Sequence, residues 1–298
     1  MKLLAIDGNS IVSRAFYGIR PLSAPDGTPT NAIYGFFSMV DRMKYELQPD
    51  AVAVAFDMHS PTFRHDMYDG YKAGRRETPQ DLLTQLALLK DLLRDFEIPV
   101  VECEHYEADD ILGTLAAKCT EAGETCCIYT GDKDSLQLVN EYVTVYLPHT
   151  KPGGTEILVY DEAKIASDFG GLTPKQLIDV KALQGDSSDN IPGVSGIGPK
   201  MATTLIAKYG SLERLYDAIE HVPEKGKLQE KLMEGKDSAF FSQTLGTICT
   251  NAPIQCELSD LYPGTPDRRI VLEDLTGFGL NRFIKEWNVD EPEISGRE

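Results

Sequence analysis

Nine carboxylates gather in five short segments of the chain, three of them at places where a parallel sheet would end its strands. Ligand crevices of open α/β folds lie outside the carboxyl ends of the strands, so we expect these side chains to converge there. Like charges held together raise one another's pKa values unless cations lie among them, and oxygen-only ligands suit Mg²⁺. The sequence therefore predicts two divalent ions, Mg²⁺ or Mn²⁺, in a site for phosphate chemistry. The nine are Asp7, Asp57, Glu107, Asp109, Asp110, Asp132, Asp134, Asp186 and Asp189.

Each of these acids also has a simpler interpretation. An Asp that follows a strand, such as Asp7 or Asp132, is most often the N-cap of the next helix. Acids at a helix start, such as 107–110, are stabilised by the helix dipole. The repetition at three strand ends, and three acids within four residues, exceed what capping requires and favour the metal site.

A glycine-rich loop follows the last acidic segment and leads into a helix that contains lysine. Gly193, Gly196 and Gly198 allow a tight turn and close approach of the backbone to a ligand. Pro199 suits the first position of a helix, whose free N–H groups, with Lys200 beside them, can bind a phosphate. An ordinary loop is the alternative for this motif alone. Its position after an acidic loop favours a helix-hairpin-helix element that binds the backbone of duplex DNA.

Basic and aromatic residues are interleaved in the segment after Asp57. Arg64, Tyr71, Lys72, Arg75 and Arg76 could hold phosphates and stack bases there. A solvated loop with extended basic side chains is the alternative. We favour a functional loop, because its position after a strand end places it over the acidic crevice.

Composition indicates a water-soluble protein of 298 residues with 42% hydrophobic residues and a net charge of −18. No apolar stretch approaches the ~20 residues of a membrane span, and the start of the chain does not have the pattern of a signal peptide. Six cysteines without C-x-x-C spacing indicate reduced thiols in the cytoplasm. The negative charge alone would argue against nucleic acid, but segments 60–76 and 193–208 are locally basic.

Apolar strands alternate with helical patterns over the first 160 residues, which predicts a largely parallel, twisted sheet flanked by helices. Strands are expected near 3–6, 51–56, 98–102, 125–130 and 142–147, with a returning strand at 156–160. Helices are expected near 30–47, 80–96, 107–121 and 133–139. A helical region follows at 161–290, with helices near 161–169, 174–184, 199–208, 211–220, 225–235 and 237–249, and a polar tail occupies 291–298. The helix-hairpin-helix falls within 174–208.

The order of these motifs resembles the flap endonuclease family, including the 5′-nuclease domain of bacterial DNA polymerase I. The resemblance covers about residues 1 to 288. It rests on the segments Leu4-Ala5-Ile6-Asp7-Gly8, Val54-Ala55-Phe56-Asp57, Phe63-Arg64, Tyr71-Lys72-Ala73-Gly74-Arg75, Tyr106-Glu107-Ala108-Asp109-Asp110, Gly131-Asp132-Lys133-Asp134 and Gly185-Asp186 through Lys200.

The resemblance implies a PIN-like α/β fold with a helical arch at about 60–96 and a helix-hairpin-helix that can carry K⁺. It implies metal-dependent hydrolysis of DNA at 5′ flaps and 5′ ends, in primer removal and repair. By motif match the nine acids are the metal ligands and Lys72 is the catalytic lysine, with Arg75 beside it. Arg14, Arg64 and Tyr71 are similar to residues that steer the 5′ strand.

The implied partners are flapped, nicked or 5′-ended duplexes, including RNA primers on DNA, and a fused polymerase domain. We further expect a monomer near the bacterial nucleoid. Two alternatives stay open from the sequence, namely a non-catalytic protein that binds DNA structures and a PIN-type ribonuclease.

Overall fold

The computed structural model describes residues 1–58, 60–219 and 226–289, so the expected tail at 291–298 lies outside the described residues. Its strands are β1 Lys2–Asp7, β2 Ala51–Phe56, β3 Val100–Glu102, β4 Thr125–Tyr129, β5 Val143–Lys151 and β6 Gly154–Tyr160. The helices before β6 are α1 Gly8–Gly18, α2 Asn31–Leu47, α3 Phe63–Met67, α4 Gln80–Asp95, α5 Ala108–Ala122 and the 3₁₀ helix η1 Lys133–Leu138. Those after it are α6 Glu162–Asp168, α7 Gln176–Gln184, α8 Pro199–Tyr209, α9 Leu212–Asp217, α10 Lys227–Glu234, α11 Lys236–Gly246, η3 Leu258–Leu261, α12 Arg268–Gly277 and α13 Asn281–Glu286.

A single six-stranded sheet organises the first part of the molecule, in the order β3-β2-β1-β4-β5-β6. Strands β1 to β5 are parallel and β6 returns antiparallel to β5. Asp7 of β1 pairs with Ala55 of β2, while Ile6 pairs with Tyr129 of β4, so the three strands end at nearly the same level. The chain crosses from β3 to β4 through α5, which makes the carboxyl ends of β1 and β4 a topological switch point.

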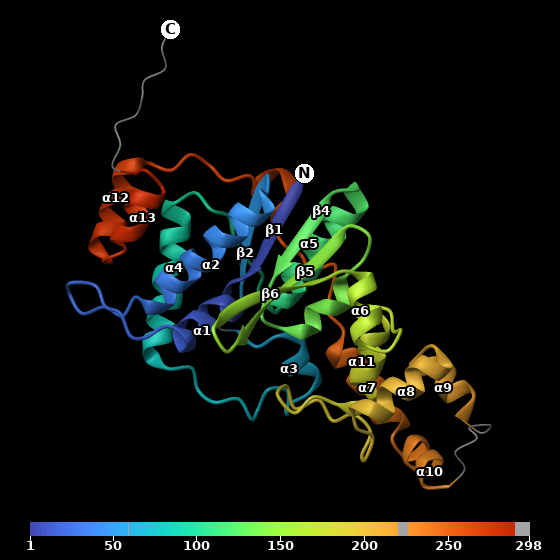
Figure 1. The fold of residues 1–298 in the computed structure, drawn as a ribbon. Helices are drawn as coiled ribbons and strands as arrows, with labels where there is room; N and C mark the ends of the chain where they lie inside the picture. Colours follow the sequence, from blue (N-terminus) through green and yellow to red (C-terminus); the bar gives the residue numbers. More distant parts are fainter. Residues whose placement is uncertain (59, 220–225, 290–298) are drawn as a thin grey trace.

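Alternate residues of the strands point to opposite faces, and each face has its own apolar core. Leu4 and Ile6 point to the face covered by α1, α2, α4, α12 and α13. Leu3 and Ala5 point to the face covered by α5. Figure 1 shows the resulting three layers, with α2 and α4 on one side of the strands. The fold class expected from the sequence, a helix-flanked and largely parallel sheet, is confirmed.

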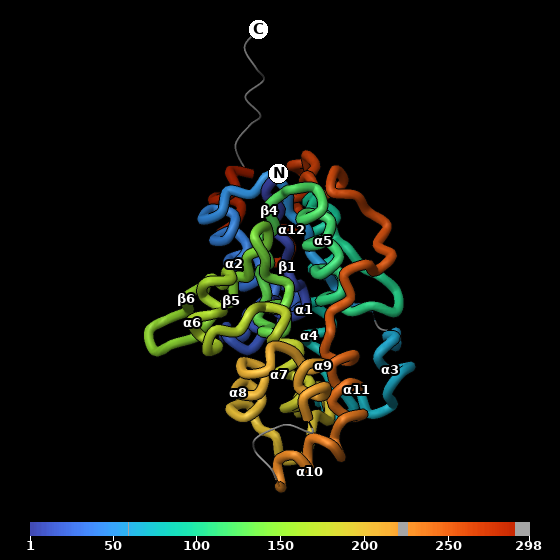
Figure 2. Tube along the Cα trace, turned by 90° about the vertical axis from the view of Figure 1, so that its right-hand side faces the viewer, coloured from blue at the N-terminus to red at the C-terminus, as the bar shows by residue number. Residues whose placement is uncertain are grey.

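The helices α7 to α11 form a smaller second part with a separate apolar core at 172–239. In Figures 1 and 2 this part lies below the sheet, with α10 at its lower end. A loop at 185–198 connects α7 to α8. The strand-end acids therefore face both the helical part and the α3 segment.

The segment expected as a helical arch, about 60–96, contains α3 and α4 joined by non-helical chain. Only the five residues of α3 are helical between β2 and α4, and residues 68–79 form turns and extended chain. Gly70, Gly74 and Pro79 disfavour helix in this segment, and Lys72 has a positive φ of 56°.

The chain also returns to the sheet after α11, whereas we expected the helical region to extend to 290. Residues 248–261 pack in the core beside α5. Val271, Leu275 and Phe283, from α12 and α13, pack in the core of the opposite face. The expected strands and helices before residue 250 are present within a few residues, but α1, α3, η3, α12 and α13 were not predicted.

Candidate metal and nucleic-acid site

Asp7 and Asp57 stand at the ends of neighbouring strands and are held by backbone hydrogen bonds. Asp7 is 5% exposed; its Oδ1 accepts from the Ser10 backbone N–H at 2.9 Å and its Oδ2 accepts from the Thr130 hydroxyl at 2.7 Å. Asp57 Oδ1 accepts from the Ala108 backbone N–H at 2.7 Å. Asp7 is thus an N-cap, as the simpler interpretation predicted, and it also belongs to the acidic cluster.

Two further acids reach the same place from α5 and from the turn after β4. Asp109 lies in the first turn of α5, and the Ser135 hydroxyl donates to its Oδ1 at 3.4 Å. Asp132 caps η1, accepting from the Asp134 backbone N–H at 2.9 Å. Three of the five acidic segments therefore supply their side chains through helix starts that follow strands.

Electrostatics shows that these carboxylates are close enough to repel one another. Burial raises the pKa of Asp7 to about 7, and the negative charges of Asp57 and Asp132 add to the rise. Burial also raises the pKa of Asp109 well above its usual value, with Asp132 and Asp7 contributing. The pKa of Asp57 is raised by burial and by Glu107. An all-oxygen cluster with this repulsion fits a hard divalent cation.

A second acidic group joins η1 to the loop at 185–198. Carboxylate oxygens of Asp134, Asp186 and Asp189 lie within 4.8 Å of one another and could together hold a metal ion. Lys181 of α7 forms ion pairs with Asp134 and with Asp186 Oδ2, the latter at 2.8 Å. Burial raises the pKa of Asp134 to about 6 although Lys181 opposes the rise. Burial would also raise the pKa of Asp186, but hydrogen bonds from Lys181 and Ser188 outweigh it and hold that pKa at about 2.

The structure removes Asp110 from the expected metal ligands. Asp110 is fully buried, and both its oxygens accept from the guanidinium of Arg64 at 2.8 Å. The backbone N–H groups of Glu107 and Cys249 donate to the same two oxygens, at 3.0 and 2.8 Å. Four hydrogen bonds leave the carboxylate no lone pair directed at an ion.

Arg64 and Tyr71 are likewise too buried to contact DNA as expected. Arg64 is 3% exposed and also donates to the Leu245 and Thr247 carbonyls, both at 2.9 Å. Tyr71 is 4% exposed, and its hydroxyl donates to Glu107 at 3.1 Å. Arg64 therefore joins α3, α5 and the end of α11, and Tyr71 packs beneath the acids.

Lys72 and Arg75 do reach the acids from the segment after α3. Lys72 Nζ lies 2.6 Å from Glu107 Oε1, and Arg75 Nη2 lies 2.6 Å from Asp189 Oδ1. The Arg75 side chain is 51% exposed, so its guanidinium is open to solvent on one side. Arg76 is exposed beside them. Arg14 instead donates to Thr150 Oγ1 of β5 at 2.5 Å.

The glycine-rich loop divides into a buried and an exposed half. Gly193 is buried, its N–H donates to Ser242 Oγ at 2.9 Å, and a Cβ there would lie 2.3 Å from the Gly185 nitrogen. Gly193 is thus needed for packing and cannot touch DNA, which corrects its expected role. Gly196, Gly198 and Lys200 are exposed at the start of α8.

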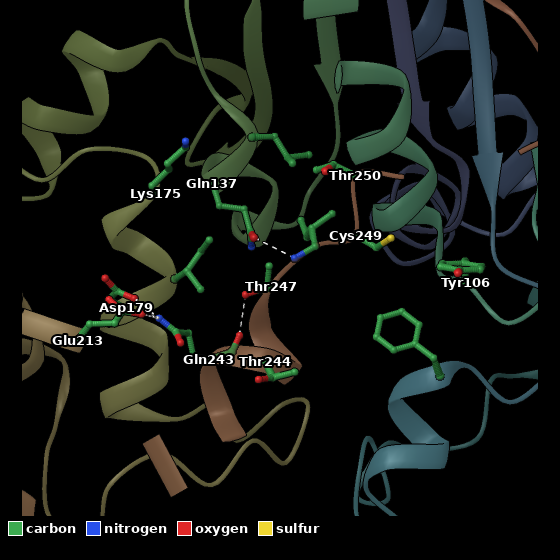
Figure 3. Close-up of a pocket in the computed structure, with 14 residues that line it drawn as sticks. Tyr106, Gln137, Lys175, Asp179, Glu213, Gln243, Thr244, Thr247, Cys249 and Thr250 are labelled. Atoms are coloured by element: carbon green, nitrogen blue, oxygen red, sulfur yellow. Dashed lines mark hydrogen bonds between the residues drawn. The ribbon is translucent and has the colours of Figure 1, made fainter. Parts of the chain in front are cut away.

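One pocket, of about 770 Å³, lies between the two parts and contains none of the nine acids (Figure 3). Gln137 spans its wall, donating to the Gly246 carbonyl at 3.1 Å and accepting from the Ile248 N–H at 2.9 Å. Gln243 donates to Asp179 on another wall at 2.7 Å. This pocket is the seam where α7 and α11 pack against the sheet domain, so the chemistry is better sought at the strand ends.

Sequence reasoning missed Lys181, Ser10 and Thr130. The last two orient Asp7 or its neighbours through hydrogen bonds that only the fold reveals. Lys181 could have been singled out from the sequence, because it is a lysine within the mainly apolar stretch that precedes the acidic loop. No helix in the described part of the chain combines the length and apolar character that a membrane span needs.

Comparison with known proteins places this geometry among nucleases. The family described as "5′-3′ exonuclease, N-terminal resolvase-like domain" matches residues 2–170. The family described as "5′-3′ exonuclease, C-terminal SAM fold" matches residues 172–269. The DNA polymerase I of Bacillus subtilis is 41% identical over 98% of this chain and 33% of its own length. That of Chloroflexus aurantiacus is 42% identical over 91% of the chain and 29% of its own length.

Solved structures agree in fold. The T5 5′-exonuclease with bound zinc superposes with a TM-score of 0.66 at 20% identity, covering 98% of this chain and all of that one. The catalytic core of Rad2 in complex with a DNA substrate gives 0.59 at 20% identity, covering 95% and 90%. The chain spans about a third of the length of the curated polymerases it matches.

Proposed function

Because this chain belongs to the 5′–3′ exonuclease family, we propose that its strand-end acids hold two divalent ions for hydrolysis of DNA at 5′ ends and 5′ flaps. The observation that carries the proposal is the convergence of Asp7, Asp57 and Asp109, whose pKa values burial and mutual repulsion raise. The T5 exonuclease was solved with divalent zinc and Rad2 with DNA, which supports both ligands.

The first ion would lie among Asp7, Asp57, Asp109 and Asp132. The second would lie among Asp134, Asp186 and Asp189, whose oxygens are close enough to share it. Glu107 adjoins both groups through its contacts with Lys72 and Tyr71. When bound, Mg²⁺ or Mn²⁺ supplies the charge that lowers the pKa of an attacking water and neutralises the phosphate.

Lys72 and Arg75 are the proposed catalytic residues of the chain itself. Both now pair with acids, at 2.6 Å in each case. Ions bound to those acids would free the two cations to contact the scissile phosphate, where they stabilise charge in the transition state. Hydrolysis then leaves a 5′-phosphate and a 3′-hydroxyl.

The exposed half of the glycine-rich loop is the proposed duplex-binding element. Pro199 opens α8, so free backbone N–H groups face solvent beside Lys200, where a phosphate can bind. A K⁺ ion at the carbonyls of this loop is part of the proposal. Such contacts bind the phosphate backbone of DNA and do not depend on the base sequence. Arg14 and Arg76 would contact the strand that leads to the site.

Preference for ends and flaps follows from the buried position of the acids. Asp7 is 5% exposed and Glu107 is 8% exposed, so a nucleotide must leave its stack to reach them. Unstacking costs a few kcal/mol in a duplex and least at a strand end or junction. Similarity to DNA polymerase I supports a role in primer removal and repair in the bacterial nucleoid, with a polymerase domain as partner.

Substitution of one strand-end acid tests the proposal. We expect Asp109→Asn to abolish Mg²⁺-dependent release of a labelled 5′ flap while binding of the same DNA in Ca²⁺ persists. The matched control is Glu121→Gln, which also removes one negative charge from α5 but at an exposed position. This variant should cleave at the wild-type rate. Undiminished cleavage by Asp109→Asn would refute the proposed metal site. If the wild-type protein bound the flap without cleaving it, the chain would be a non-catalytic binder of DNA structures. If the wild-type protein preferred an RNA hairpin as substrate, it would be a ribonuclease.

A further inference from the structure

Lys181 is the one buried lysine in the described part of the chain, with 7% of the residue exposed. Its ammonium group donates to Asp134 and, at 2.8 Å, to Asp186. Both acids come from segments outside α7, so a single lysine joins η1 to the loop at 185–198. A compact charge held by two carboxylates from separate segments has the surroundings of a bound cation.

The middle of the Lys181 stem packs closely against α11. A Cβ added at Gly246 of α11 would lie 3.3 Å from Lys181 Cδ and 3.6 Å from its Cγ. The missing side chain at Gly246 thus leaves room for the lysine stem where α11 packs against α7. This close packing distinguishes Lys181 from a surface lysine that pairs with a passing acid.

The same two acids could also bind a metal. Oxygens of Asp134, Asp186 and Asp189 lie within 4.8 Å of one another. A divalent ion among them and the ammonium of Lys181 would compete for the same oxygens, and their positive charges would repel at short range. The second proposed metal position is therefore shared with a cation that belongs to the protein.

We propose that Lys181 is a tethered cation that holds the second metal subsite while it lacks an ion and swings aside when a divalent ion binds. The proposal rests on the proposed function, since it needs Asp134, Asp186 and Asp189 to bind metal. A cavity of about 320 Å³ adjoins the lysine and extends from Asp134 and Asp186 to Gln184, Pro199 and Thr203, which all line it together with Lys181. The displaced ammonium has room there, next to the start of α8.

Displacement into that cavity would link metal binding to DNA binding. Pro199 and Thr203 belong to the first two turns of α8, beside the proposed phosphate site. The lysine would thus leave the acids and approach the duplex backbone in one movement. In the metal-free protein it offsets the repulsion between Asp134 and Asp186, so it stabilises the fold at the expense of affinity for the second ion.

Binding of Mn²⁺, measured by electron paramagnetic resonance on the intact chain, tests the proposal. We expect Lys181→Met, which keeps the apolar stem, to bind the weaker of two Mn²⁺ ions about tenfold or more tightly, because a competing charge is removed. Lys133→Met is the matched control, since Lys133 lines the same cavity and is exposed, with no ion pair in the described structure. Its Mn²⁺ affinity should change less than about threefold. An unchanged or weaker second ion in Lys181→Met overturns the proposal.

Wild-type protein gives a second measurement that does not depend on a variant folding. Acetylation of Lys181, followed by mass spectrometry, should be slow in EDTA and several times faster with Mn²⁺, while Lys133 reacts alike in both. Equal rates at Lys181 overturn the proposal. Suppose that the wild type binds two Mn²⁺ ions and cleaves a flap while the Mn²⁺ affinity of Lys181→Met and the acetylation rate of Lys181 both stay unchanged. In that case only the proposed role of Lys181 fails. If it binds no Mn²⁺, the proposed function and this inference fall together.

Discussion

Replacing Asp7 by Asn should make the metal-free protein more stable, because the ionised carboxylate of Asp7 is buried and its burial lowers the free energy of unfolding. The pKa of Asp7 rises from 3.8 to about 7 in the folded protein. Between these values the folded state binds one proton more than the unfolded state, so the free energy of unfolding falls as the pH rises. About three pKa units at 1.36 kcal/mol each give a loss of about 4 kcal/mol, complete above pH 7.

Asn removes this loss while keeping the helix cap. Its Oδ1 can still accept from the Ser10 N–H, whereas the Thr130 hydroxyl loses its acceptor, at a cost of about 1 kcal/mol. We expect Asp7→Asn to gain about 3 kcal/mol of unfolding free energy at pH 8 in EDTA. At pH 4, where burial of the charge no longer counts, it should lose up to about 1 kcal/mol through the Thr130 contact. Saturating Mg²⁺ should stabilise the wild type more than the variant, because the variant keeps only the second metal position.

Urea unfolding at the two pH values, with and without Mg²⁺, measures these differences. Asp161→Asn is the matched control, because Asp161 is also a helix N-cap, accepting from the Lys164 N–H at 2.7 Å, but is exposed. Its effect on the free energy of unfolding should be small, because the side chain is exposed to solvent. If Asp7→Asn were less stable than the wild type at pH 8, or equally stabilised at both pH values, the repulsive cluster would not exist as described.

Three further outcomes follow from the same contacts. Arg64→Ala should lower the unfolding free energy by about 3–5 kcal/mol in urea titrations, because it leaves Asp110 buried without its partner; a loss below 1 kcal/mol would contradict this pairing. Lys200→Ala should weaken binding of duplexes of any sequence and reduce the slope of affinity against salt by about one unit, so a loss confined to one sequence would argue against backbone contact. Mn²⁺ affinity, measured by calorimetry, should fall as the pH drops below about 7. Asp7 and then Asp134, with pKa values of about 7 and 6, take up protons that a metal must displace. An affinity that stays constant from about pH 8 to about pH 5.5 would contradict this expectation.

Periodicity in the sequence predicted most of the sheet and its helices, because apolar strands and amphipathic helices leave strong local patterns. It missed α1, since β1 runs into this helix without a loop and Asp7 serves as both strand end and cap. The return of α12 and α13 to the sheet depends on contacts with α2 and α4 that no local pattern contains.

The acids were found as a set, but their roles could not be separated from the sequence. Asp109 and Asp110 are neighbours on α5, about 100° apart around a helix axis. One faces the other carboxylates, and the second faces Arg64. Similarly, an arginine among aromatic residues predicts phosphate binding, yet Arg64 is buried against two carbonyls of the distant α11 end. Which side of a helix or loop meets the core is decided by tertiary packing.

The two proposed metal positions should differ in affinity, because their acids differ in whether a lysine or arginine already pairs with them. Asp7, Asp57 and Asp109 form no ion pair with lysine or arginine in the described residues, so a divalent ion there only relieves repulsion. Asp134 and Asp186 already have Lys181, and Asp189 has Arg75, so an ion there must first displace a cation.

Displacing a cation costs part of the Coulomb energy that the incoming metal gains. Two Mn²⁺ affinities that differ by about an order of magnitude or more are therefore expected, with the tighter ion at the strand ends. The tighter binding should be lost in Asp7→Asn and kept in Asp186→Asn. If both substitutions weakened the same ion equally, the two groups of acids would have to act as a single site, and the distinction between unpaired and paired carboxylates would have no consequence for metal binding.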